Sequence, residues 1–194
     1  MAFSVTDFKS NLKQGGARSA LFSVDLKYPS FLSNSPTKSQ FFVKSTSLPS
    51  STVGTYDVFY HGKAIKVAGD RSFDTWETNI INDEDFQIRI ALEEWVNHMG
   101  NRVLNSRSKE LDKATSGSPG YEGFNSQYKK EISVTQFAKN GKGLFTYTFK
   151  GAFPTTVAAI PLDWGSADIE EYSVTWSYDS WERTTAKSTE TVIP

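Results

Sequence analysis

The stretch Ile65–Gly100, IKVAGDRSFDTWETNIINDEDFQIRIALEEWVNHMG, contains the clearest structural pattern in this chain. Apolar and polar residues alternate in Ile65–Ala68 with the period of a β-strand, and extended chain resumes at Ser72–Trp76. Between these segments we expect a sharp turn at Gly69-Asp70-Arg71. The second half of the stretch changes to a helical period. This order of strand, turn, strand and helix, in a chain otherwise rich in strand patterns, indicates a mainly β fold.

The helix expected at the end of this stretch carries one apolar stripe. Asp83 is the residue type of an N-cap, and Glu84 and Asp85 suit the positive end of the helix dipole. Gly100 and Asn101 are a stop signal. The apolar residues recur on one helical face, which we expect to pack onto a sheet: Ile88, Leu92, Trp95, Val96 and Met99.

The turn residues admit two interpretations. In the functional one, Arg71 contacts an anion or a partner. In the structural one, Gly69 tolerates a positive φ and Asp70 hydrogen-bonds its own backbone, while Arg71 pairs with a nearby acid such as Asp74. We favour the structural interpretation, because this order of residues is typical of tight turns.

Strand patterns recur along most of the chain after a short lead at residues 1–20, in which a helix is one option. Two hairpins are expected, one about His61-Gly62 and one about Asn140–Gly143. In the last strand Tyr172, Val174, Trp176 and Tyr178 share a face. The expected strands are Leu21–Leu26, Phe41–Thr46, Val53–Tyr60, Lys63–Ala68, Glu131–Ala138, Leu144–Lys150 and Glu171–Trp181.

These elements predict a mainly β fold, a β-sandwich or barrel of roughly seven or eight strands with one packed α-helix. We expect one domain at residues 1–182, with exposed loops inserted at 28–39 and 103–125. The loop at 28–39 contains two prolines and several hydroxyl residues, and the loop at 103–125 is the longest irregular segment. A polar, threonine-rich C-terminal tail follows at 183–194.

Composition excludes several classes of function. The chain has 194 residues and a net charge of -1, from 21 basic and 22 acidic residues, whereas proteins that grip nucleic-acid phosphates usually have a clear basic surplus. The absence of cysteine excludes disulfides, thiolate metal sites and a cysteine nucleophile. Met1–Asp7 shows no signal-peptide pattern and no apolar run approaches the ~20 residues that cross a bilayer, so we expect no membrane anchor.

No group of residues in the sequence is arranged for catalysis. Glu94 and His98 have a spacing that allows one metal ion, but a solvated helix face is the better interpretation. The acid pairs Asp70/Asp74 and Glu93/Glu94 are more typical of surface charge than of a glycosidase. Trp76, Trp95 and Trp176 lie on apolar stripes and are expected in the core. We therefore predict no catalytic, cofactor-binding or metal-binding residue.

A series of short motifs, in fixed order over about residues 17–182, carries a family resemblance: Thr46-x-Leu48-Pro49, Val67-Ala68-Gly69-Asp70-Arg71-Ser72-Phe73-Asp74-x-Trp76, Asn82-Asp83-Glu84, Tyr128-Lys129-Lys130, Gln136-Phe137-Ala138, Lys150-Gly151-x-Phe153-Pro154-Thr155, Leu162-Asp163-Trp164 and Tyr178-Asp179-x-Trp181-Glu182. In these motifs the chain resembles the tail tube proteins of T-even-type contractile-tailed bacteriophages. It departs from the family pattern at Tyr28–Ser39, in a longer Val103–Asn125 loop and in the tail beyond Glu182.

The resemblance implies a structural virion protein of the phage tail, not an enzyme, which is assembled in the host cytoplasm. Family members form homo-hexameric rings whose strands join into one barrel, and the rings stack on themselves into a tube that conducts DNA. The implied partners are the tail sheath protein, baseplate tube-initiator proteins, the tape-measure protein and, transiently and non-specifically, the phage DNA. The fold is similar to that of the ring protein of type VI secretion systems.

Two other functions stay open at the level of sequence. One is a tube-initiating baseplate protein or secretion-system ring protein, although such initiators tend to be longer chains. The other is a carbohydrate-binding β-sandwich module that uses exposed tryptophans. If the tube function holds, the first hairpin is expected to join the inter-subunit barrel, because it has few charges. The residues proposed for this contact are Val53, Thr55, Tyr56, Val58 and Tyr60.

Overall fold

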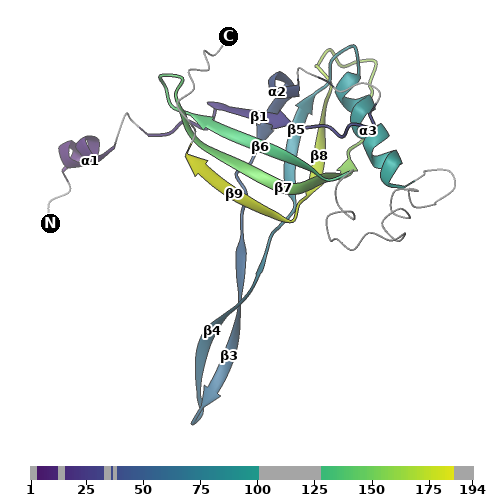
Figure 1. Cartoon of the computed structure of the whole chain (residues 1–194). Coiled ribbons are helices and arrows are strands. Elements are labelled where there is room, and N and C mark those ends of the chain that lie inside the picture. The colour runs from purple at the N-terminus through teal and green to yellow at the C-terminus, as the bar shows by residue number, and fades with distance from the viewer. Residues whose placement is uncertain (1–3, 13–15, 33–35, 37–38, 101–127, 186–194) are drawn as a thin grey trace.

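A computed structural model describes residues 4–12, 16–32, 36, 39–100 and 128–185. Within this described part the chain forms nine strands and three helices (Figure 1). The mainly β fold is therefore confirmed. Two short helices accompany the expected one, and the first of them, at Val5–Asn11, lies in the lead where a helix was one option. The helices are α1 (Val5–Asn11), α2 (Ser39–Phe42) and α3 (Gln87–Met99), and the strands are β1 (Phe22–Leu26), β2 (Val43–Thr46), β3 (Thr52–Tyr60), β4 (Lys63–Ser72), β5 (Trp76–Ile81), β6 (Lys130–Phe137), β7 (Gly143–Val157), β8 (Glu171–Ser177) and β9 (Ser180–Thr185).

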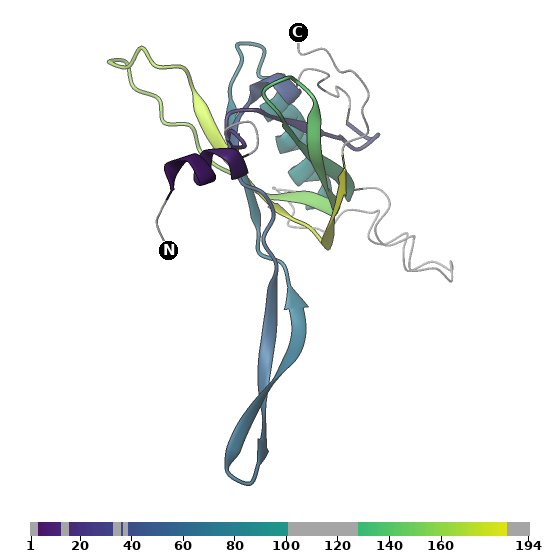
Figure 2. The ribbon, with the colours of Figure 1, turned by 90° about the vertical axis from the view of Figure 1, so that its left-hand side faces the viewer.

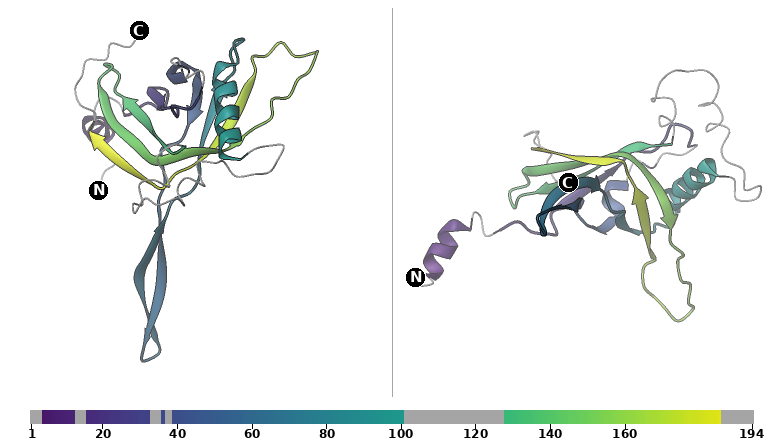
Figure 3. Two further views of the ribbon diagram at one scale, coloured as in Figure 1. Left: turned by 45° about the vertical axis from the view of Figure 1, so that its right-hand side comes forward. Right: turned by 90° about the horizontal axis from the view of Figure 1, so that it is seen from below.

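The strands form an antiparallel seven-stranded sheet and a separate two-stranded hairpin of β3 and β4. The long strand β7 joins the two halves of the main sheet. Its first part pairs with β6 and β9, and its last part, from Phe153, pairs with β8. Beyond these, β1 pairs with β6, and β5 and β2 follow β8. The two halves diverge in direction where β7 bends, and α3 lies beside the β8 half (Figure 3).

The core lies where α3 meets the two halves of the sheet, and three tryptophans form its centre. Trp76, Trp95 and Trp176 are all buried, as the sequence predicts. The Trp95 ring meets the Trp176 ring edge-on at 5.8 Å, and Trp76 stacks on Phe149 at 4.4 Å between centroids. The indole N–H of Trp176 donates to Thr78 Oγ1 (2.9 Å), so the buried polar atoms of this pair are satisfied.

Helix α3 presents the predicted stripe to this core but begins later than expected. Ile88, Leu92 and Trp95 are buried, and Val96 and Met99 are half-buried at the edge of the stripe. The predicted N-cap at Asp83 is wrong, because residues 83–86 form a turn in which the N–H of Phe86 donates to the Asp83 carbonyl (2.9 Å). Phe86, with a φ of 51°, precedes the first helical residue.

The predicted turn at Gly69-Asp70-Arg71 is also wrong, because β4 runs through these residues to Ser72. The register with β3 shifts between Val53 and Thr55, so Gly54 lies against Gly69 and Asp70. A Cβ on Gly69 would lie 3.2 Å from the Gly54 carbonyl oxygen. Gly69 therefore serves a close approach of two backbones at a bulge rather than a positive φ.

The segment at 28–39, predicted as an exposed loop, contributes described residues to the core. Pro29 and Leu32 are buried, and the Tyr28 ring lies 6.2 Å from that of Trp95. Phe31 stacks on His98 with 3.7 Å between ring centroids. The described part of the segment is irregular, as predicted, but its apolar side chains cover α3, so the predicted exposure is wrong.

The end of the chain differs from the prediction in two places. The expected strand Glu171–Trp181 is interrupted at Tyr178 and Asp179, where the chain leaves β8 and returns along β7 as β9. Residues 183–185, assigned to the polar tail, continue β9. The predicted loop at 103–125 and the tail residues 186–194 lie outside the described residues.

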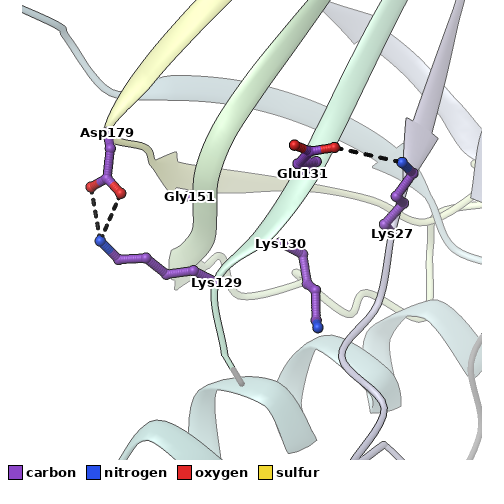
Figure 4. A pocket seen from close by; sticks show the side chains of 6 residues that line it. All are labelled: Lys27, Lys129, Lys130, Glu131, Gly151 and Asp179. Carbon is purple, nitrogen blue, oxygen red and sulfur yellow. Dashed lines mark hydrogen bonds and ion pairs between the residues drawn. The ribbon is translucent and has the colours of Figure 1, made fainter. Parts of the chain in front are cut away.

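Gly151 allows the bend of β7. Its φ is 67°, in the left-handed region, and a Cβ there would collide with the carboxylate of Asp179. The N–H of Asp179 donates to the Lys150 carbonyl (3.0 Å), and its carboxylate binds Lys129 Nζ at 2.8 and 2.9 Å. Figure 4 shows the Asp179 carboxylate and the Lys129 ammonium facing each other beside Gly151 of β7. The bend and the break between β8 and β9 are thus one corner.

We expect Trp95→Ala to lower the free energy of unfolding by about 3–5 kcal/mol, because it removes a fully buried ring at the centre of the core. Denaturant unfolding measures the change. Ile90→Ala, on the exposed side of α3, is the matched control and should alter stability by no more than about 0.5 kcal/mol. Equal effects of the two substitutions would contradict the proposed packing of α3.

We expect Gly151→Ala to cost about 1–3 kcal/mol in backbone strain, with a further loss from displacing Asp179. Thermal or denaturant unfolding of the purified chain measures it. Gly100→Ala is the control, because the backbone of Gly100 is extended and a Cβ there meets nothing within 4 Å. A Gly151→Ala variant as stable as the parent would show that the corner is not sterically fixed.

Candidate inter-subunit surfaces

The β3–β4 hairpin projects far from the rest of the chain (Figures 1 and 2). Tyr60 pairs with Lys63 across the expected two-residue turn, in which His61 and Gly62 have φ of 48° and 80°. Positive φ at both central residues is typical of the tight turn whose twist matches a hairpin. Every residue of β3 is exposed to solvent. The hairpin therefore offers both of its faces to another molecule.

The pairing register makes one face of this hairpin apolar. Residues directly opposite each other in an antiparallel pair share a face. Tyr56 therefore shares a face with Val67, Val58 with Ile65, and Tyr60 with Lys63. Tyr56, Val58, Tyr60 and Ile65 are each between 46% and 67% exposed. We call this set, with Val67, the apolar hairpin face: Tyr56, Val58, Tyr60, Ile65 and Val67.

The opposite hairpin face is mixed in character. Asp57 pairs with Lys66, Thr55 with Ala68, and Phe59 with Ala64. Of the five residues that the sequence proposed for inter-subunit contact, the register therefore brings Tyr56, Val58 and Tyr60 together and leaves Thr55 on the other face. Ile65 and Val67 were missed, although their alternation with Lys66 is the signal that identifies them.

The motif residues Gly69, Asp70 and Arg71, which the sequence predicted as a turn, lie at the base of this hairpin rather than at a separate site. Gly69, Asp70 and Arg71 continue β4 toward the main sheet, and Val53 pairs with Arg71. Asp74, the acid expected to partner Arg71, accepts a hydrogen bond from Ser50 Oγ (3.1 Å).

A charged hollow on the surface is lined by Lys27, Lys129, Lys130, Glu131, Gly151 and Asp179 and has a volume of about 440 Å³ (Figure 4). Two of its three lysines are neutralised. Lys129 binds Asp179, and Lys27 lies 3.8 Å from Glu131. The Lys129–Asp179 pair lies at the β7 corner, whereas the exposed Lys27–Glu131 pair joins the end of β1 to β6. Its described lining residues include no histidine, serine or threonine, so they offer neither an imidazole base nor a hydroxyl nucleophile.

The other residues weighed for chemistry occupy structural positions. His98 stacks on Phe31, whereas Glu94 is exposed, and Glu93 forms an ion pair with Arg89 (3.0 Å). Burial raises the pKa of the phenols of Tyr28 and Tyr172, which keeps both neutral in the core. Among the described residues, no group of three or more histidine or acidic side chains could hold a metal ion.

In the described part of the chain, no helix has the length and apolar character needed to cross a membrane. Among the described residues, two surface features stand out, namely the projecting hairpin with its apolar face and the sheet edges at β1, β2 and β9. An exposed sheet edge is a ready template for pairing with another chain.

Comparison with known proteins places this chain in a family. A family described as phage tail tube protein matches residues 6–184. The chain is 33% identical to tail tube protein gp19 of Enterobacteria phage T4 over 168 residues, which cover 86% of this chain and 91% of that protein. The corresponding protein of Enterobacteria phage T6 is 32% identical over the same length.

A solved structure shares the fold at lower identity. The tube-terminating cap of the anti-feeding prophage superposes with a TM-score of 0.59 at 20% identity, over 88% of this chain and 91% of the cap chain. The family match spans nearly the whole described chain and includes both the hairpin and the β7 corner. This chain therefore belongs to the phage tail tube protein family.

Proposed function

We propose that this chain is the protomer of a contractile-tail inner tube, in which six copies close into a ring and the rings stack into a conduit for DNA. The observation that carries the proposal is the apolar hairpin face on a hairpin that leaves the body of the subunit (Figure 2). Family membership over residues 6–184 supports it, since the relatives are named as tail tube proteins.

The sheet edges give a physical reason for ring closure. In the main sheet, β1 and β2 lie at the two ends of the strand order, so each presents one unpaired side. A closed barrel is the arrangement that removes such edges. Contacts between two different patches of one subunit generate a closed ring when the rotation between neighbours closes.

The charge balance suits a conduit. A channel lining along which DNA slides should not carry a surplus of cationic side chains. Such side chains would bind the phosphates, because binding releases the counterions of the DNA. The chain carries a net charge of -1. Within this proposal the protein acts structurally rather than catalytically, is assembled in the host cytoplasm, and contacts the tail sheath, the baseplate tube initiators and the tape-measure protein.

The carbohydrate-binding alternative loses most of its basis in the structure. A sugar platform needs exposed aromatic rings, and three of the five tryptophans are buried. Trp181 is half-buried, and its indole N–H donates to the Ser50 carbonyl (3.1 Å). Trp164 alone is fully exposed, and one ring is a weak platform.

We expect Ile65→Asp to leave the subunit folded but abolish rings and tubes. Ile65 is 50% exposed, so the substitution costs the monomer little, whereas it places an unpaired carboxylate in a contact that excludes water. Negative-stain microscopy and sedimentation of the purified chain measure assembly, and circular dichroism reports the fold.

The matched control is Ala64→Asp, which adds the same charge at the neighbouring position on the mixed face, opposite Phe59. This variant should assemble like the parent. Tubes of normal appearance from Ile65→Asp would show that the apolar hairpin face is not an inter-subunit contact.

A further inference from the structure

The segment between β7 and β8, residues 158–170, is a firmly held projection rather than a loose loop. At its start, the N–H of Ala158 donates to the Ser173 carbonyl (2.9 Å), and the Arg89 guanidinium donates to the Ala158 carbonyl (3.0 Å). At its end, the backbone and the side-chain amide of Asn82 donate to Glu170, each at 2.8 Å. Both ends of the segment are therefore fixed to the sheet and to α3.

Its tip is folded by its own polar groups. The N–H of Gly165 donates to Asp163 Oδ1 (2.9 Å), and the N–H of Ser166 donates to the Asp163 carbonyl (3.2 Å). Ser166 Oγ accepts from the N–H of Asp168 (3.2 Å). An aspartate turn of this kind holds the backbone in one conformation. We call residues 158–170 the Trp164 loop.

The folded tip directs large apolar side chains into solvent. Trp164 is fully exposed, Leu162 is 80% exposed and Ile169 is 71% exposed. The charges of the Trp164 loop are all negative, at Asp163, Asp168 and Glu170, with no lysine or arginine. An exposed tryptophan on an ordered turn is typical of an anchor that fills a pocket on a partner. The pocket that would suit it is apolar with a basic rim.

Such a pocket lies on the same chain, at the foot of the β6–β7 turn. Its volume is about 360 Å³, and its lining residues are Gly16, Ala17, Arg18, Phe137, Ala138, Lys139 and Leu144. Phe137 and Leu144 supply apolar walls. Arg18 and Lys139 supply the basic rim, and the described residues of the lining include no acid. We call it the Phe137 pocket.

We propose that the Trp164 loop of one copy docks into the Phe137 pocket of a second copy. The β6–β7 turn and the Trp164 loop, drawn in yellow-green between β7 and β8, lie on opposite sides of the subunit (Figures 1 and 3). One copy therefore cannot satisfy its own pocket with its own loop. Two different patches that fit each other form a head-to-tail contact, which is the type that closes a ring.

This contact rests on the proposed ring assembly and specifies residues outside the hairpin. Charge complementarity between the acidic loop and the basic rim fixes the occupant as a copy of this chain and sets its orientation. Because the loop is ordered before it binds, little conformational freedom is lost on docking. Rising salt should weaken the contact, since the rim charges are exposed to solvent.

Cysteine cross-linking tests the contact directly, because the parent chain has no cysteine. The double variant Ala138→Cys/Ala167→Cys keeps Trp164 and both cationic side chains. On mild oxidation it should give a ladder of covalent oligomers ending at the closed ring, whereas each single variant should give at most a dimer. Absence of the ladder in preparations that show rings by microscopy would overturn the docking proposal and leave the ring function standing.

The behaviour of the unsubstituted chain distinguishes a failure of the docking contact from a failure of the proposed ring function. If the unsubstituted protein forms no rings or tubes, the proposed function fails and the docking contact fails with it. A competing occupant of the pocket is α1 of the same chain, since Val5 and Phe8 are exposed. A Phe8→Cys/Ala138→Cys variant that cross-links within one chain, beside an Ala138→Cys/Ala167→Cys variant that does not cross-link, would overturn the proposal.

Truncation of the anchor measures its contribution. Trp164→Ala should leave the melting temperature unchanged, because the ring is fully exposed, but weaken the association constant of each contact about thirtyfold. Sedimentation over a concentration series measures that loss. Phe41→Ala removes another exposed ring, in α2, that belongs neither to the Trp164 loop nor to the lining of the Phe137 pocket; it is the control and should assemble normally. Equal assembly of the two variants would contradict the anchor role.

A charge exchange tests the orientation. Arg18→Glu should reduce assembly, because it places an acid on the rim that faces the acidic loop. Adding Asp168→Arg in the same chain should restore most of the loss, since the reversed charges again meet across the contact. Failure of the second substitution to restore assembly would show that these two charges do not face each other between copies.

Discussion

The bend of β7 at Gly151 holds the two halves of the main sheet together. One strand pairs with β6 and β9 before the bend and with β8 after it, so the two halves of the sheet cannot separate without breaking backbone hydrogen bonds. Asp179 occupies the space that a side chain at residue 151 would need, and it also binds Lys129. The corner thereby fixes the walls between which the three buried indoles pack.

The same architecture leaves the β3–β4 hairpin without support from its own chain. A two-stranded hairpin is marginally stable at best in water, and an apolar face on it adds exposed surface that favours association. Here the strands are 9 and 10 residues long, with large apolar side chains in register along one face. A covering neighbour would supply the burial that the monomer lacks, which ties the order of the hairpin to assembly.

Periodicity predicted the parts of the fold that packing alone determines. The α3 stripe and the burial of Trp76, Trp95 and Trp176 follow from apolar spacing, and the His61–Gly62 turn follows from two strand patterns that end on either side of it. Two of the incorrect predictions occur where the same sequence pattern is compatible with two local structures. Gly69 suits a turn as well as a close backbone approach, and only its pairing partner Gly54 distinguishes them. The strand expected at Glu171–Trp181 likewise runs across a break at Tyr178 and Asp179, where Asp179 lies against Gly151. The candidate surfaces were predicted only in part, because a face is defined by register, which the sequence of β3 alone does not contain.

The two proposed contacts, through the Trp164 loop and through the hairpin, differ in whether the segment is held in place before a partner binds. The Trp164 loop is clamped at Ala158 and Glu170 before any partner arrives, so its binding free energy is not spent on folding the segment. The hairpin gains its burial only in the assembly. With a net charge of -1, copies of the chain repel one another weakly at long range, so orientation depends on local patches. A rigid, charged loop suits that selection, because a wrong approach would set acid against acid or leave the apolar tip in water. In this proposal the Trp164 loop selects the orientation of a neighbouring copy, and the hairpin stabilises the assembly by burying its apolar face. The two roles belong to separate elements of one subunit.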